Sequence, residues 1–170
     1  MLQVKRVNKE ELINKGRQTI EAYSFKSEIC QVIQEELKKI DGKKITKRVA
    51  TSMENALKKI DAGLRVSYSK DSMGWYNFGV WSSSIQYLNY SNRLSLMISN
   101  SDLNDDETYN HEGFITRYKW LNNWHEHIAE IEKDLDMIEN SNMIEEYNKA
   151  YELIESTRNS LSGLRYELTR

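Results

Sequence analysis

Proline is absent from the 170-residue sequence, and cysteine occurs only once. Without proline no helix is broken by its ring, so turns must depend on Gly, Asn, Asp and Ser. A single cysteine excludes an internal disulfide framework and is typical of a reducing compartment. Because Cys30 lies among apolar helical positions in "SEICQVIQEEL", we expect it to be an inert core thiol.

Long hydrophobic runs are missing as well. No run approaches the ~20 apolar residues that cross a bilayer, and "MLQVKRVNKEEL" lacks the apolar core of a secretory signal. A mean hydropathy of -0.73 and a charged share of 29% indicate a soluble protein, while 39% hydrophobic residues can supply a core. The expected location is therefore the cytoplasm, without a membrane partner.

Signatures of catalysis or of metal binding are also lacking. The sequence contains no P-loop, dinucleotide fingerprint or nucleophile elbow. The loop 102–113 has the alternating oxygen ligands of a calcium loop, but Glu107 and Gly113 stand where such a loop needs glycine and glutamate. His125 and His127 lie about 200° apart on a helix, too far around it to share one ion. We expect no cofactor, no metal and no enzyme; an unfamiliar carboxylate site is the enzymatic alternative.

The net charge of -2 conceals a strong asymmetry along the chain. Residues 1–70 contain 16 Lys and Arg against 9 Asp and Glu, a net +7, whereas residues 71–170 contain 8 against 17, a net -9. Such asymmetry bears on partners rather than on the fold.

Hydrophobic periodicity predicts an α+β fold. A 3.6-residue period indicates three N-terminal helices, which begin at Asn8, at Ser24 or Ser27, and near Thr46. From Leu64 the period changes to two, and short turns separate roughly four strands of an antiparallel meander, within 64–69, 75–81, 85–89 and 93–99. The N-terminal helices should pack on this sheet, with the core formed in part by Tyr76, Phe78 and Val80.

Helical periodicity returns after a polar loop and continues to the end of the chain. Apolar residues recur at alternating spacings of three and four from Leu121 to Ile138 and again from Ile144 to Leu161. Because "ENSN" separates the two seams, they predict an antiparallel, coiled-coil-like hairpin that projects or folds back on the sheet. The expected division is an α+β domain over 1–112 and the hairpin over 113–170. Pairing of the seams between two chains, giving a homodimer, is an equal alternative.

Three surfaces are candidates for function. Carboxylates crowd the hairpin and could bind a basic partner: Glu126, Glu130, Asp134, Asp136, Glu145 and Glu152. Trp75 and Trp81 in "KDSMGWYNFGVW" face away from Phe78, either buried by a neighbouring helix or exposed as a stacking surface for a partner. "KKIDGKKITKR" (Lys38–Arg48) carries the cations that could contact nucleic acid directly, Lys43, Lys44, Lys47 and Arg48.

Four features occur together in the sequence: the absence of proline, the segments "KKIDGKKITKR" and "SYSKDSMGWYNFGVW", and the acidic tail. In these features the sequence resembles small orphan proteins of phages and plasmids, including anti-CRISPR-type inhibitors. That resemblance implies a bacterial host cell and a basic, nucleic-acid-binding partner such as a CRISPR effector nuclease. We therefore expect a non-catalytic protein-binding inhibitor or adaptor. A nucleic-acid-binding protein that uses Lys38–Arg48 is the alternative.

Overall fold

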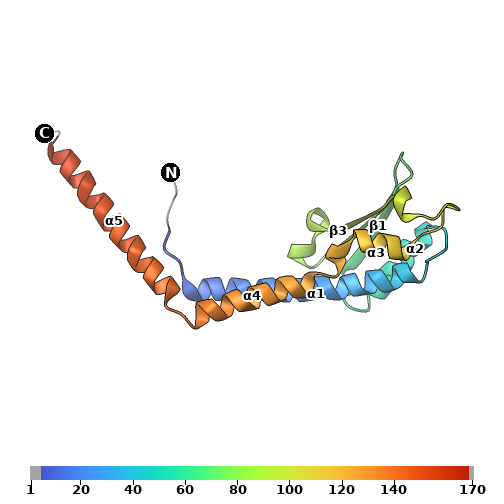
Figure 1. Cartoon of the computed structure of the whole chain (residues 1–170), viewed down its shortest axis with the longest axis horizontal. Coiled ribbons are helices and arrows are strands. Elements are labelled where there is room, and N and C mark those ends of the chain that lie inside the picture. The colour runs from blue at the N-terminus through green and yellow to red at the C-terminus, as the bar shows by residue number, and fades with distance from the viewer. Residues whose placement is uncertain (1–4, 169–170) are drawn as a thin grey trace. The chain divides into compact units, whose positions relative to one another are not determined.

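The computed structural model describes residues 5–168, which form an α+β structure with five α-helices and a three-stranded antiparallel sheet (Figure 1). The chain divides into two units. Of the described residues, the helical unit contains 5–21 and 128–168, and the α+β unit is Ala22–His127. This division cuts the chain at different places from the boundary expected at residue 112. Within residues 5–168 no helix has the length and apolarity of a membrane span.

The regular elements are distributed over both units. The helices are α1 (Lys9–Lys38), α2 (Lys47–Leu57), α3 (His111–Arg117), α4 (Trp124–Glu139) and α5 (Met143–Leu168), the strands are β1 (Leu64–Lys70), β2 (Tyr76–Ser82) and β3 (Leu94–Ile98), and short 3-10 turns lie at η1 (Gln86–Leu88), η2 (Tyr90–Asn92), η3 (Asn100–Asp102) and η4 (Lys119–Leu121).

Helix α1 is one continuous helix where the sequence predicts two. Its start agrees with the prediction, because the Asn8 side chain accepts a hydrogen bond from the Glu11 amide at 3.2 Å. The predicted second start at Ser24 or Ser27 is wrong, since both serines lie inside the helix. Neither proline nor glycine occurs between residues 17 and 41, and serine is tolerated within a helix at a small cost.

A tight turn after α1 leads into α2. Gly42 has a φ of 69°, the left-handed conformation that glycine adopts without strain, as its place after the apolar periodicity predicts. The Gly42 amide donates to the Tyr109 carbonyl, and the Tyr109 amide donates to the Lys43 carbonyl, both at 2.9 Å. These bonds fix the basic turn against the loop that precedes α3.

The sheet has the order β1-β2-β3 with antiparallel neighbours. The prediction of a fourth strand over 85–89 is wrong, because this stretch contains the 3-10 turn η1 and only Leu88 of its residues is buried. Too few alternating apolar residues occur there to form a strand with one buried face. The antiparallel meander itself is confirmed, with Val66 opposite Val80 and Phe78 opposite Leu96.

The core of the α+β unit lies between one face of the sheet and helices α1 and α2. Alternate strand residues face this core, and Phe78, Val80 and Leu96 are buried. Tyr76, also predicted to be inside, is partly buried and packs at the border of the core. The buried helix residues that meet them are Ile29, Ile33, Leu37, Val49, Met53 and Leu57.

A buried carboxylate joins α1 to α2 at the edge of this core. Glu36 accepts hydrogen bonds from Lys39 and, at 2.7 Å, from the Ser52 hydroxyl. Burial alone raises the pKa of Glu36, but the bonds from Lys39 and Ser52 and the charge of Lys39 together outweigh burial, so that its pKa is lowered. The ionised form is therefore the one that the fold stabilises.

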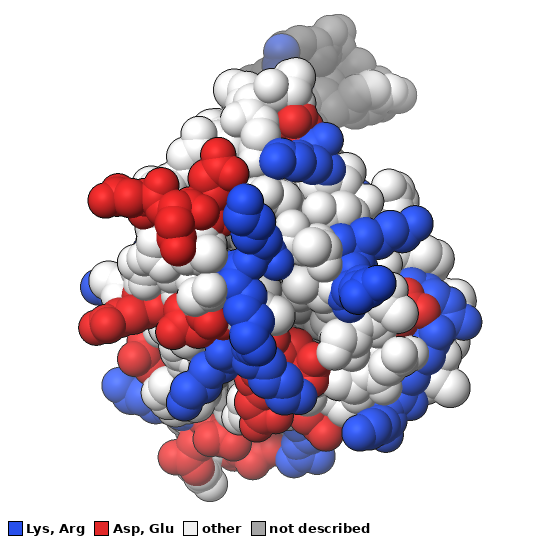
Figure 2. Space-filling model, turned by 90° about the vertical axis from the view of Figure 1, so that its right-hand side faces the viewer, with Lys and Arg blue, Asp and Glu red and all other residues white. Residues whose placement is uncertain are grey.

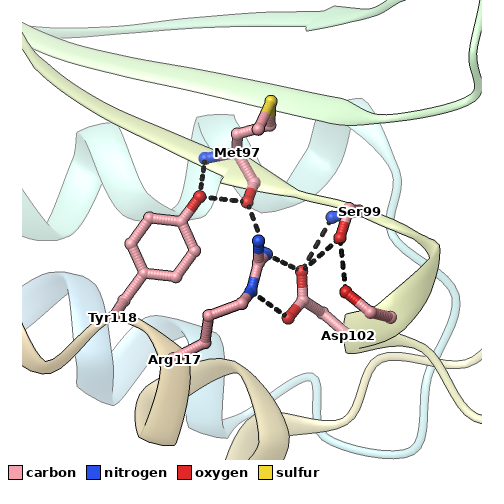
Figure 3. A network of polar contacts seen from close by, with 6 residues as sticks. Met97, Ser99, Asp102, Arg117 and Tyr118 are labelled. Atoms are coloured by element: carbon pink, nitrogen blue, oxygen red, sulfur yellow. Dashed lines mark hydrogen bonds and ion pairs between the residues drawn. The ribbon is translucent and has the colours of Figure 1, made fainter.

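The free edge of β3 is closed by polar contacts from the last residue of α3, Arg117, and from Tyr118, which follows it (Figure 3). The Tyr118 hydroxyl donates to the Met97 carbonyl at 2.5 Å and accepts from the Met97 amide at 3.2 Å. Arg117 also donates to this carbonyl, at 3.2 Å, and pairs with Asp102 through two guanidinium nitrogens. Since an unpaired strand edge can pair with another chain, these contacts protect β3 from edge-to-edge association.

In the helical unit, α4 packs against α1 through close approach at a glycine. A Cβ atom on Gly16 would lie 2.5 Å from Leu135 Cδ2, so a larger residue at this position would require the buried leucine to shift. The first turns of α5 are covered by the segment before α1: the Val7 amide donates to Asn148 Oδ1 at 2.9 Å. The coiled-coil pairing of α4 with α5 predicted from the two seams is not confirmed.

Candidate functional site

The predicted acidic surface is divided by the structure. Glu130, Glu132, Asp134 and Asp136 are exposed on α4 within the helical unit, and we call these four residues the acidic surface of α4. Glu126 is exposed as well but belongs to the α+β unit.

The two predicted acidic residues of α5 already have cationic partners. Glu145 Oε1 lies 3.2 Å from Lys9 Nζ, and Glu152 Oε1 lies 3.7 Å from an Arg6 guanidinium nitrogen. A hydrogen bond from its own backbone amide and then the bond from Lys9 lower the pKa of Glu145. These two carboxylates are therefore partly neutralised within the helical unit.

The far half of α5 is more apolar on its surface than the sequence suggested. Leu153, Ile154, Leu161 and Leu164 are 69%, 53%, 61% and 55% exposed. The spacing of apolar residues predicts the seam through Ile154 and Leu161 but does not predict that it is exposed. Whether an apolar seam is covered depends on tertiary packing, which periodicity does not report.

Trp75 and Trp81 are both half-buried, a state between the full burial and the exposure that were the two predicted alternatives. They lie six positions apart along extended chain, about 20 Å at 3.3 Å per residue. The Trp81 ring meets the Tyr90 ring edge-on at 5.6 Å, whereas the Trp75 amide is tied to the Asp71 carboxylate at 2.9 Å. The two tryptophans therefore do not form a single stacking surface.

A polar cavity of about 590 Å³ lies on the α+β unit and involves residues that sequence reasoning missed. Gly79 forms part of its floor, where a Cβ would lie 2.7 Å from the Ser67 hydroxyl and 2.9 Å from Arg93 Cδ. The Arg93 guanidinium lies 4.6 Å from the centre of the Tyr90 ring and donates to the Tyr90 carbonyl at 2.9 Å. The sequence feature that could have indicated this cavity is the alternation of serine with apolar residues along the strands. The cavity offers hydroxyl groups and one cation to a small polar ligand.

The basic segment Lys38–Arg48 spans the end of α1, the turn and the start of α2. Figure 2 views the end of the molecule where α1 ends and α2 begins, and it shows Lys and Arg side chains interspersed with Asp and Glu. Lys39 is paired with Glu36, and Lys44 lies 3.9 Å from Glu107.

The other predicted cations of this segment, Lys43, Lys47 and Arg48, are exposed. Lys43 Nζ donates to the Lys39 carbonyl at 3.0 Å, which holds its ammonium group at the C-terminal end of α1. The segment is therefore an ordered cationic surface of three to four side chains, partly compensated by neighbouring acids.

The loop with calcium-like spacing is organised by its own side chains. Asp102 is paired with Arg117, and the Asp106 carboxylate accepts from the Thr108 hydroxyl at 2.5 Å and its amide at 3.1 Å. Glu107 adopts a φ of 64° at the tip of the turn. In the part of the chain that the structure describes, no three His, Cys, Asp or Glu side chains are grouped as a metal site requires.

Cys30 is fully buried, as expected from its apolar neighbours. Burial raises the pKa of its thiol to about 11, against the smaller lowering effect of a hydrogen bond from Trp124 Nε1, which lies 3.2 Å from the sulfur. The thiol therefore stays protonated at neutral pH, which makes it a poor nucleophile.

No protein-family model, curated protein or solved structure matches the chain. Function must therefore be inferred from the surfaces of the two units. The resemblance to anti-CRISPR-type inhibitors stays a prediction.

Proposed function

We propose that the protein is a non-catalytic protein-binding module, an inhibitor or adaptor, that binds a basic partner through the acidic surface of α4. The observation that carries this proposal is four exposed carboxylates within seven residues, Glu130 to Asp136, with Lys133 as the one cation among them. Ile131 and Leu135 alternate with them and are the more buried residues of this stretch.

The spacing of these carboxylates places like charges near one another on α4. Glu130 and Asp134 lie four residues apart, as do Glu132 and Asp136, so each pair places like charges together, one pair on each flank of the stripe formed by Ile131 and Leu135. Such a pair destabilises a helix by about 0.2–0.5 kcal/mol. A cationic partner would relieve this repulsion and would also be steered to the surface electrostatically.

The partner class follows from the charge. A protein that binds nucleic acid presents a cleft rich in Arg and Lys, and a helix with closely spaced carboxylates is complementary to such a cleft. The module would then compete with nucleic acid for the cleft. A bacterial nuclease, including a CRISPR effector, is the partner that the resemblance implies.

Capture from a bacterial lysate with charge-reversed variants tests this function. The full chain is immobilised as the wild type, as Glu132→Lys/Asp134→Lys/Asp136→Lys, and as the control Glu10→Lys/Glu21→Lys/Glu28→Lys, which reverses the same number of exposed carboxylates on α1. We expect the wild type and the control to retain a basic protein from nuclease-treated lysate and the α4 variant to lose it. Equal retention by all three proteins would contradict the proposal.

Direct nucleic-acid binding is the second candidate, favoured by the exposed cations Lys43, Lys47 and Arg48 on an ordered turn. Binding should then weaken about tenfold or more between roughly 50 and 200 mM salt. The variant Lys43→Glu/Lys47→Glu/Arg48→Glu should abolish a gel shift that the control Lys15→Glu/Lys119→Glu/Lys149→Glu retains. A shift that both variants retain would exclude this segment as the binding site.

A further inference from the structure

The far half of α5 exposes an apolar stripe that a soluble protein does not normally leave uncovered. Leu153, Ile154, Leu161 and Leu164 are all more than half exposed. We propose that a second copy of the chain covers this stripe, with the two α5 helices antiparallel. This inference goes beyond the protein binding proposed above and does not depend on it.

The stripe has the form of a helix-pairing seam. Ile154, Arg158, Leu161 and Arg165 follow one another at spacings of four, three and four, the repeat of a coiled coil. A shallow groove of about 550 Å³ runs along this side of the helix and is lined by the same residues. Arginine at a seam position can bury its aliphatic stem while its guanidinium reaches the edge.

The charge distribution along α5 selects self-pairing in the antiparallel direction. From Met143 to Glu155 the helix carries four Glu and one Lys, whereas from 156 to 166 it carries Arg158 and Arg165 and no acid. In an antiparallel pair the acidic half of one helix meets the basic half of the other. In a parallel pair each half would meet its like.

The covered and uncovered parts of α5 set the position of the overlap. Residues 5–9 engage the first turns, through Val7 with Asn148 and Lys9 with Glu145. The stretch 153–166 remains for pairing and is about 21 Å long at 1.5 Å per residue. Glu155 Oε1 lies 3.6 Å from an Arg158 guanidinium nitrogen of the same helix, and antiparallel overlap of this stretch brings Glu155 of one copy within one residue of the level of Arg165 of the other. The contact occurs twice, as two-fold symmetry requires.

Sedimentation equilibrium of the full chain tests the association. We expect a species of twice the monomer mass of 20.1 kDa, and we expect Leu161→Glu to weaken self-association about tenfold or more, since it places a charge in the seam. Asn159→Glu is the matched control, because residue 159 lies about 200° around the helix from residue 161. It should associate like the wild type, and far-UV circular dichroism should show equal helix content in all three proteins.

Charge exchange tests the direction of pairing. Glu155→Arg and Arg165→Glu should each weaken the dimer, because each brings like charges together across the antiparallel pair. The double variant Glu155→Arg/Arg165→Glu should restore it. A monomeric wild type, including one whose α5 folds back on α4, would overturn the proposal. A dimer that Leu161→Glu does not weaken would also overturn it. So would a dimer that both single charge variants leave unchanged, which is the result expected of a parallel pair.

Discussion

Replacing Asp102 with alanine should destabilise the α+β unit by about 3 kcal/mol. Asp102 is 1% exposed and accepts hydrogen bonds from the Ser99 amide at 2.8 Å, the Ser99 hydroxyl at 3.1 Å and Arg117 Nε at 2.9 Å (Figure 3). Removing one partner of a buried ion pair costs about 3–5 kcal/mol. Because the Arg117 side chain is 40% exposed and water can solvate it, we expect the lower end of this range.

The hydrogen bond that the Ser99 amide loses sets a minimum for the destabilisation by Asp102→Ala. Its amide loses the Asp102 carboxylate as acceptor, and an unsatisfied buried donor costs about 1–3 kcal/mol. Asp102→Asn keeps an acceptor for Ser99 but removes the charge opposite Arg117, so it should lie between the wild type and Asp102→Ala.

Urea unfolding followed by tryptophan fluorescence measures this effect, since all four tryptophans lie in the α+β unit, at positions 75, 81, 120 and 124. Asp105→Ala is the matched control, because Asp105 is exposed in the following loop and its replacement should change the free energy of unfolding by less than about 0.5 kcal/mol. If Asp102→Ala and Asp105→Ala unfold at the same urea concentration, the network does not stabilise the edge of β3 as described.

Three further predictions concern single groups. Because the pKa of Glu36 is lowered in the folded protein, this carboxylate stabilises the fold above its unfolded pKa of about 4.3, and the effect is lost as the pH falls through the folded value. Glu36→Gln should therefore flatten the acid side of a plot of unfolding free energy against pH. An unchanged acid side would refute this role. Cys30 should react with a thiol reagent at neutral pH only after denaturant is added, because its pKa is raised to about 11; rapid labelling of the native protein would contradict its burial. Gly42→Ala should cost about 1 kcal/mol in urea unfolding, since a side chain is strained at a φ of 69°, and an equally stable variant would show that the turn relaxes.

Local signals in the sequence located the elements that depend on neighbouring residues. The Asn8 cap, the Gly42 turn and the alternation from Leu64 onward each reflect backbone or side-chain geometry within a few residues. The antiparallel order of β1, β2 and β3 follows from the short connections between them. The prediction of a fourth strand is wrong because the turn-forming residues around Leu88 outweigh the short apolar stretch there.

Features that depend on distant residues could not be read in the same way. Nothing in the sequence around Gly16 indicates a packing role, yet this glycine permits the close approach of Leu135, which is 119 residues away in the chain. The partners of Glu145 and Glu152 are likewise cations near the N-terminus. Sequence spacing identifies a run of carboxylates, but only the fold shows which of them are compensated.

The candidate surfaces show the same limit. The acidic surface of α4 follows from the run of carboxylates in the sequence and is exposed, whereas the polar cavity around Gly79 and Arg93 could not be predicted because its residues come from four separate segments. Exposure of Leu161 could not be inferred either, since a buried and an exposed seam have the same periodicity.

The most direct measurement is a competition experiment with the basic protein that the wild-type chain retains from lysate. That protein is loaded with labelled nucleic acid and titrated with the wild type, with Glu132→Lys/Asp134→Lys/Asp136→Lys, and with the α1 control Glu10→Lys/Glu21→Lys/Glu28→Lys. Release of the nucleic acid by the wild type and the control, but not by the α4 variant, is the predicted result. Release by the α4 variant at the same concentrations, or binding of the wild type without any release, would contradict it.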